Sequence, residues 1–254
     1  MIKMSFEPNA ENIVYIAAVF LLAGVVKGVL GIGMPLITIP MLATTIGPIT
    51  AMALLAVPTF AINLVQAVQS GYMAGAFRRF WTAFPLAIIG VSISVSLLLT
   101  KLDRGALMIL VGVVVVLIAA SQLMSFTINI PRRAERWCTP LVGIASGLVG
   151  GVSSFLGPLM VMYLVALRVE KDQFVGAIAL FYMIAGAPFY IGLGVNGYFG
   201  WTVFWASCGA TVMIWLGVLV GQRLRARASS DLFRKLVLGL LIVIGVNMIR
   251  KGMM

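Results

Sequence analysis

The stretch Gly24-Val25-Val26-Lys27-Gly28-Val29-Leu30-Gly31-Ile32-Gly33-Met34-Pro35 interrupts an apolar run with glycines and a proline. A second stretch, Gly143–Pro158, repeats this spacing of glycines and ends in Gly157-Pro158. Glycine tolerates non-helical backbone, and proline suits the first turn of a new helix. We therefore expect a helix break at each place. Two similar breaks indicate that the chain consists of two related halves.

Long apolar segments surround both breaks and identify the solvent as lipid. Hydrophobic residues make up 62% of the 254 residues and charged residues only 10%, whereas a soluble domain carries about 25% charged residues. Ten apolar segments are separated by polar connections: Ile13–Leu30, Met34–Ile46, Ile49–Val68, Trp81–Leu99, Ala106–Met124, Leu141–Val152, Leu156–Leu167, Phe174–Leu193, Trp201–Gly221 and Leu236–Ile249. Three of them are shorter than the roughly 20 residues that cross a bilayer. The chain is predicted to be an all-α integral membrane protein with eight to ten membrane segments, the short ones re-entrant or parts of broken helices.

Matching residues recur in the same order along both halves. Residues 1–124 are predicted to form the first repeat, residues 125–137 a cytoplasmic linker and residues 138–254 the second repeat. The matches are Gly24, Gly28 and Gly31 with Gly143, Gly147 and Gly150, Pro35-Leu36 with Pro158-Leu159, Gly71-Tyr72 with Gly197-Tyr198, Gly90 with Gly217, and Gly112 with Gly239.

Five segments in each half predict that the second half is inverted relative to the first. Arg78 and Arg79 lie in one connection, whereas the matched connection, Val195–Gly200, has no charge. With both termini in the periplasm, most cations fall in cytoplasmic connections, as the positive-inside rule requires. Joining each short pair into one crossing gives eight helices but puts the arginine-rich connection Gln222–Lys235 outside. The inverted arrangement is therefore favoured.

The two glycine-rich stretches carry a family resemblance. Gly24–Pro35, which runs on to Ile39-Pro40, resembles the first motif of the TauE/SafE sulfite exporter family, and Gly143–Gly151, which leads to Gly157-Pro158, resembles that family's second copy of the motif. The resemblance covers essentially the whole chain, although the glycine run is thinner here, with Met34 and Pro35 after Gly33. It implies export of sulfite, a sulfonate or a related organosulfur or carboxylate anion across the bacterial inner membrane. A passive anion channel and a transporter of another small solute remain alternatives.

The paired breaks are the first candidate for the substrate site. The predicted binding residues there are Gly31, Gly33, Pro35, Ser153, Ser154, Gly157 and Pro158. Free N–H groups and partial positive charge at a helix N-terminus suit an anion, and two such ends near the midplane would allow alternating access. We also expect Ser153 and Ser154 to cap the helix that begins near Leu156–Pro158. The alternative is that these glycines only permit close helix packing.

Polar side chains inside apolar segments are further candidates. Lys27 is a cation within a segment, and it is expected either to partner the anion or to extend toward the headgroups. Thr59, Asn63, Gln66 and Ser70 share one helical face, of which Asn63 and Gln66 are predicted to line the substrate path. Tying helices together is their alternative role. Tyr182 and Tyr190 also share a face, where they either pack or bring hydroxyls to the substrate.

The remaining composition excludes several classes of function. The chain has no histidine, only two cysteines in separate segments, and acidic residues only outside the apolar segments. No catalytic residue, metal ligand or cofactor is therefore predicted, and the chain is not expected to be an enzyme. The net charge of +11 reflects topology and lipid headgroups rather than nucleic acid. The expected partners are a small anion and the bilayer, and the sequence does not indicate an oligomer.

Overall fold

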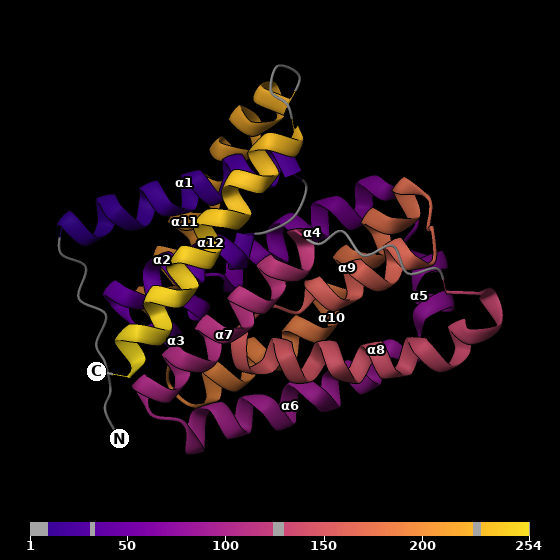
Figure 1. Ribbon diagram of the computed structural model, residues 1–254, viewed down its shortest axis with the longest axis horizontal. Coiled ribbons are helices and arrows are strands. Elements are labelled where there is room, and N and C mark those ends of the chain that lie inside the picture. Colours follow the sequence, from indigo (N-terminus) through magenta and orange to yellow (C-terminus); the bar gives the residue numbers. More distant parts are fainter. Residues whose placement is uncertain (1–9, 31–33, 124–129, 226–229, 254) are drawn as a thin grey trace. The chain divides into compact units, whose positions relative to one another are not determined.

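The computed structural model describes residues 10–30, 34–123, 130–225 and 230–253. Over these residues the chain is helical apart from turns and short connections, as predicted (Figure 1). The helices are α1 (Ala10–Leu30), α2 (Met34–Ile46), α3 (Pro48–Ala53), α4 (Ala56–Ser70), α5 (Met73–Phe80), α6 (Ala83–Lys101), α7 (Arg104–Leu123), α8 (Arg132–Ser153), α9 (Gly157–Ala166), α10 (Lys171–Val195), α11 (Trp201–Arg225) and α12 (Ser230–Gly252).

The helices form two compact units, each assembled from separate pieces of the chain. The first unit contains Met1–Pro58, Asp103–Ser125 and Gly197–Met254, and the second contains Thr59–Leu102 and Phe126–Asn196. Each unit therefore combines helices from both predicted repeats. The chain passes from one unit to the other inside α4, at Pro58–Thr59.

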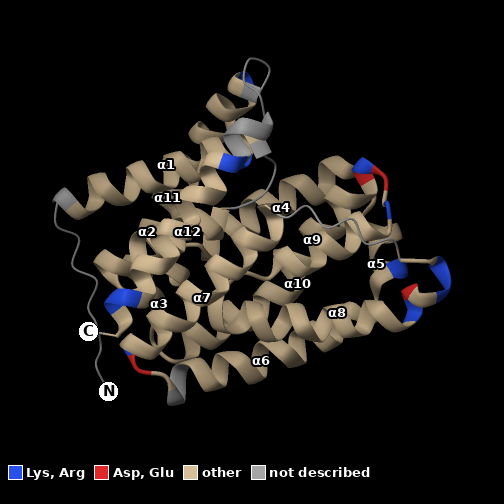
Figure 2. Ribbon diagram, in the orientation of Figure 1, with Lys and Arg blue, Asp and Glu red and all other residues tan. Residues whose placement is uncertain are grey.

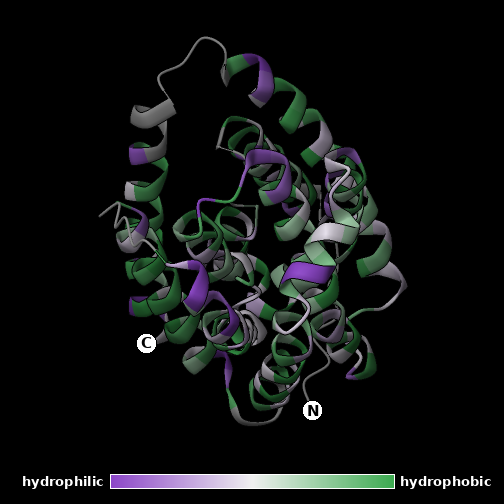
Figure 3. Cartoon of the chain, turned by 90° about the vertical axis from the view of Figure 1, so that its right-hand side faces the viewer, coloured by the Kyte–Doolittle hydropathy of each residue, from purple (hydrophilic) through white to green (hydrophobic). Residues whose placement is uncertain are grey.

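Five helical stretches of the described chain are long and apolar enough to cross a membrane: Asn12–Val29, Pro48–Ser70, Arg104–Leu123, Lys171–Val195 and Trp201–Leu224. The bent pair α5–α6 would make a sixth. Figure 3 shows the predominance of hydrophobic residues along these helices. Helices α2 and α9 are apolar but short, as expected from the sequence. The chain is thus a multi-pass membrane protein.

Several boundaries differ from those predicted. The segment expected at Ile49–Val68 is divided into α3 and α4, and α5 meets α6 at 76°. Helix α8 begins at Arg132, so the end of the predicted linker is helical. The division at Leu54-Leu55 has a local cause, because Pro58 cannot donate a backbone hydrogen bond to the preceding turn. Asp103 caps the start of α7, where the Ala106 N–H donates to Asp103 Oδ1 at 2.9 Å.

Glycines bring α1 and α11 into backbone contact in the first unit. A Cβ on Gly24 would lie 2.9 Å from Ile214 Cα, and one on Gly28 would lie 2.5 Å from the Val218 carbonyl oxygen. Both helices advance by four residues between these contacts, so they run in the same direction. Small residues permit such close packing where lipid gives no hydrophobic driving force.

Helices α6 and α8 form an equivalent seam in the second unit. A Cβ on Gly147 would lie 2.9 Å from Ala87 Cα, and one on Gly151 would lie 3.0 Å from Val91 Cα. These two helices also run in the same direction. By contrast, α7 and α12 are antiparallel, because Gly105 meets Gly252 while Gly112 meets Gly245. Most of the glycines in the two motifs that the structure describes therefore serve packing.

An ion pair joins two connections that the charge pattern predicts to be cytoplasmic. Arg79 Nε lies 2.6 Å from Glu135 Oε1, and Arg79 Nη2 lies 3.1 Å from Glu135 Oε2. The two residues lie at the ends of α5 and α8, where basic and acidic segments meet in Figure 2. These ends must lie on the same side of the membrane.

The first prediction tests that topology with single cysteines in a background in which Cys138 and Cys208 are replaced by alanine. Cysteines at the exposed positions Arg78 and Arg133 should react with a membrane-impermeant maleimide only from the cytoplasm. A cysteine at exposed Asn196, which follows the 25-residue helix α10, should react only from the periplasm. Labelling of Arg78→Cys and Asn196→Cys from the same side would refute the inverted topology.

Candidate functional site

The break between α8 and α9 is the polar centre of the second unit. Helix α8 ends at Ser153, and its C-cap residue Ser154 has a left-handed backbone conformation with φ 62°. Helix α9 begins at Gly157, and Pro158 is its second residue. A non-glycine residue in this conformation costs of order 1–3 kcal/mol and is typical of functional sites. The second predicted break is therefore confirmed as a strained reversal of the chain.

Both serines are buried at the break, but they do not cap α9. The Ser153 hydroxyl donates to the Val149 carbonyl at 2.6 Å and accepts from the Phe155 N–H at 3.3 Å. The backbone N–H of Ser154 donates to the Gly150 carbonyl at 2.6 Å. No side chain caps the start of α9, so the expectation of a serine cap was wrong. The serines satisfy the end of α8 instead, because the chain reverses before α9 starts.

Tyr182 of α10 lies at the N-terminus of α9. Its hydroxyl lies against Gly157, whose N–H is one of the groups that a helix leaves without a partner in its first turn. A Cβ on Gly157 would collide with this hydroxyl. Gly157 is thus required for the close approach of Tyr182 to the helix end.

Tyr190 connects the break to α4. Its hydroxyl lies 3.1 Å from Thr59 Oγ1 and also interacts with Ser154. Asn63, one turn further along α4, donates from Nδ2 to the Thr59 carbonyl at 2.7 Å. Tyr190, Thr59, Asn63 and Ser154 are all buried. Polar groups from α4, α8, α9 and α10 therefore converge, and we call Thr59, Asn63, Ser153, Ser154, Gly157, Tyr182 and Tyr190 the hydroxyl cluster.

The hydroxyl cluster contains no carboxylate, lysine, arginine or histidine side chain. Its members supply hydroxyls, an amide and backbone N–H groups. Hydroxyl and amide groups reorient and offer donors to an oxyanion. The partial positive charge of the α9 N-terminus adds to this effect. Among the described residues no group of three or more His, Cys, Asp or Glu side chains is suited to a metal ion. The arrangement favours an anion held by neutral donors.

The other predicted residues are distributed over both units. Lys27 is partly buried in α1, and Pro35 is buried in the first turn of α2, where a proline was expected. Gly31 and Gly33 lie outside the described residues. Gln66 is partly buried one turn beyond Asn63. Pro158 is the second residue of α9. Because proline has no N–H, this position of the first turn needs no hydrogen-bond acceptor.

The polar face of α4 has two roles along its length. Thr59 and Asn63 belong to the hydroxyl cluster, whereas Ser70 closes the end of the helix. The Ser70 hydroxyl donates to the Ala67 carbonyl at 2.7 Å and accepts from the Tyr72 N–H at 3.2 Å. The face therefore contributes to the candidate site at one end and secures backbone at the other.

A second polar network lies at the opposite end of α8. The Thr139 hydroxyl donates to the Glu135 carbonyl at 2.6 Å and also contacts the Tyr163 hydroxyl of α9. The Glu135 carboxylate binds Arg79. This network joins α5, α8 and α9 away from the break, so it stabilises the helix hairpin that carries the hydroxyl cluster.

Sequence reasoning identified Thr59, Tyr182 and Tyr190 as polar or aromatic residues on shared faces, but it did not include them among the binding residues. It missed Ser207, which is fully buried and contacts the backbone of the first unit at Leu54 and Val57. The signal in the sequence was Pro58. A proline within a membrane span leaves the carbonyl four residues earlier without its N–H donor, so another group must supply one. The sequence does not say which residue supplies it.

Comparison with known proteins identifies the family. Neither the curated proteins nor the solved structures yield a match to the chain. The family described as "Sulfite exporter TauE/SafE" matches residues 16–248, which includes both breaks and the hydroxyl cluster. The chain therefore belongs to the TauE/SafE family of membrane transporters.

Proposed function

We propose that this protein exports sulfite, a sulfonate or a related small organic anion across the bacterial inner membrane by alternating access. The observation that carries the proposal is the convergence of neutral donors at the α8–α9 break. A small oxyanion fits such a set, since it accepts several hydrogen bonds at once. Family membership supports a sulfur oxyanion as the substrate class.

A neutral site suits export of an anion. A full countercharge would hold the anion tightly, whereas hydroxyls and a helix N-terminus bind it without trapping it. The membrane potential drives an anion outward by about 2.3 kcal/mol per charge per 100 mV. Export therefore requires no buried carboxylate to carry a coupled proton.

The helix contacts within each unit support the proposed inverted repeat. Helices α1 and α11 pack in parallel, as do α6 and α8. In the proposed repeat, α1 is equivalent to α8, and α6 to α11. Each pair then joins the first apolar segment of one half to the fourth apolar segment of the other half. The antiparallel pair α7–α12 is what a two-fold axis in the membrane plane would produce from equivalent helices.

The contacts also favour a revised register for the repeat. With Gly90 matched to Gly217, Ile214 of α11 corresponds to Ala87 of α6, and Gly24 meets Ile214 as Gly147 meets Ala87. Gly24 is then equivalent to Gly147 rather than to Gly143, a shift of one helical turn from the match in the sequence. The revised register gives Gly24 and Gly147 the same sequence separation as Pro35 and Pro158.

The second prediction concerns the substrate. Proteoliposomes containing the purified protein should transport labelled sulfite or a sulfonate with saturable kinetics, and substrate on the opposite side should accelerate the flux. Short carboxylates serve as the comparison. Sulfite should also raise the melting temperature, because a ligand at about 100 times its Kd adds about 2.7 kcal/mol of stability. Flux that increases linearly with concentration and is not accelerated would indicate a channel instead.

The third prediction concerns Gly157. The Gly157→Ala substitution should displace the Tyr182 hydroxyl and remove the melting-temperature increase caused by sulfite, while the melting temperature without sulfite changes little. Gly112→Ala is the control, because its Cβ would lie 2.7 Å from the Gly245 carbonyl oxygen. That variant should be less stable yet retain the increase with sulfite. A full response to sulfite in Gly157→Ala would exclude the α9 N-terminus as the site.

The fourth prediction separates the two proposed roles of Lys27. If Lys27 attracts the anion, Lys27→Met should raise the KM for transport about tenfold, which corresponds to about 1.4 kcal/mol. Lys27→Arg should retain part of the function because the charge remains. Lys251→Met, at an exposed position near the end of α12, is the control for loss of one positive charge. Unchanged transport by Lys27→Met would assign Lys27 to the lipid headgroups.

A further inference from the structure

The candidate span Pro48–Ser70 is interrupted at Leu54-Leu55, between α3 and α4. In a continuous helix the N–H of residue 58 would donate to the Leu54 carbonyl, but Pro58 has no N–H. The Leu54 side chain is fully buried and Pro58 is buried as well. A backbone carbonyl freed at such a place needs another donor, because lipid supplies none.

Ser207 of α11 provides that donor. Its hydroxyl donates to the Leu54 carbonyl at 2.8 Å and accepts from the Val57 N–H at 3.1 Å. A serine hydroxyl can donate one hydrogen bond while it accepts another. One fully buried side chain thus satisfies a backbone group on each side of the break.

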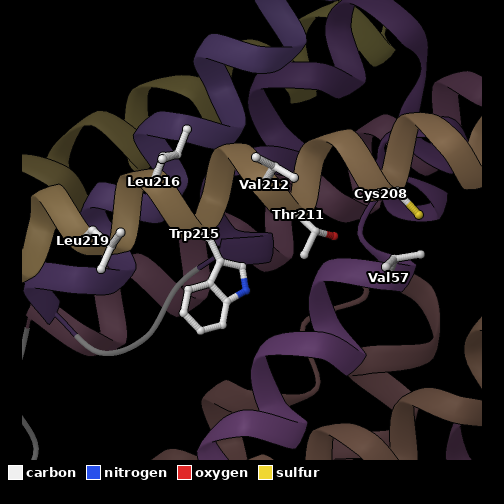
Figure 4. Close-up of a pocket in the computed structure, with 7 residues that line it drawn as sticks. All are labelled: Val57, Cys208, Thr211, Val212, Trp215, Leu216 and Leu219. Atoms are coloured by element: carbon white, nitrogen blue, oxygen red, sulfur yellow. The ribbon is translucent and has the colours of Figure 1, made fainter.

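The side of the break next to Ser207 borders an apolar surface. An apolar groove of about 340 Å³ borders Val57 and is lined along α11 by Cys208, Thr211, Val212, Trp215, Leu216 and Leu219 (Figure 4). The Thr211 hydroxyl is occupied, because it donates to the Ser207 carbonyl at 2.8 Å. The polar contacts at this edge of the break are therefore the two hydrogen bonds of Ser207, one to Leu54 and one to Val57.

The break determines where α4 presents its polar residues. Thr59 follows Pro58 directly and contacts Tyr190, and Asn63 lies one turn further on. The chain also passes from the first unit to the second at Pro58–Thr59. Ser207 therefore fixes the start of α4 immediately before the residues that contact Tyr190 and the Thr59 carbonyl.

We propose that Ser207 is a positioning residue for transport: it replaces the N–H that Pro58 lacks and fixes the backbone that leads directly into Thr59 and Asn63. This inference rests on the proposed function, because it assigns the cluster to the transported anion. A continuous helix through residue 58 would change the backbone immediately before Thr59, whose hydroxyl contacts Tyr190. Stability and transport should therefore respond differently when the break is removed.

The fifth prediction is a double-mutant cycle in the full-length protein with Ser207→Ala, Pro58→Ala and the double variant. Ser207→Ala leaves two buried backbone groups without partners and should lower the melting temperature by about 3–8 °C. It should also raise the KM for sulfite roughly tenfold, because the binding groups move. Pro58→Ala restores the N–H for Leu54. In the Pro58→Ala background, Ser207→Ala should lower the melting temperature by less than half as much as it does in the wild type. Transport should stay impaired in both proteins that carry Pro58→Ala.

Thr211→Ala is the matched control, since it removes a hydroxyl one turn away whose hydrogen bond goes to the Ser207 carbonyl of the same helix. Its melting temperature and KM should equal those of the wild type. The proposal would be overturned if Ser207→Ala lowered the melting temperature equally in both backgrounds. It would also be overturned if the double variant recovered transport together with stability. If Ser207→Ala alone cannot be purified, purification of the double variant supports the proposal and its failure contradicts it. The melting comparison needs no substrate, so a wild type that transports no sulfite would contradict only the proposed function.

Discussion

The pairing of backbone hydrogen-bonding groups in an apolar solvent is the constraint on which this structure depends. An uninterrupted helix satisfies its own backbone, but each break frees carbonyl and N–H groups that lipid cannot satisfy. The protein supplies partners from other helices or from the break itself: Ser207 at the α3–α4 break, and Ser153 with Tyr182 at the α8–α9 break. Several buried polar side chains therefore lie at helix breaks or contact them, namely Ser153, Ser154 and Ser207.

Glycines serve two purposes that the sequence does not distinguish. Gly24, Gly28, Gly147 and Gly151 bring helix backbones together, because a Cβ at any of them would meet the neighbouring helix. Gly157 instead gives a tyrosine hydroxyl access to a helix end. Packing glycines stabilise the framework in the absence of a hydrophobic driving force, and the glycine at the break makes room for polar chemistry. A substitution therefore has different consequences at the two kinds of position.

The candidate site combines polarity with the absence of charge among its described members. Hydroxyls, an amide and helix-terminal N–H groups stabilise an anion without the desolvation cost that a buried ion pair would add. The charged network of Arg79 and Glu135 lies at the other end of α8, where it joins three helices. Charge thus fastens the framework, while neutral dipoles form the site.

The sequence by itself determined the helical membrane class, the family, the break before Gly157 and the short apolar helices, because apolar length and glycine or proline placement act locally. It also predicted Asn63, Ser153, Ser154 and Gly157, which the structure brings into one cluster. Only the tertiary structure decided that Tyr190 joins Thr59 to Ser154, that Ser207 completes a span more than 140 residues away in the chain, and that most motif glycines pack helices. These features depend on which helices meet and in what register, and side-chain spacing along one helix does not specify its neighbour.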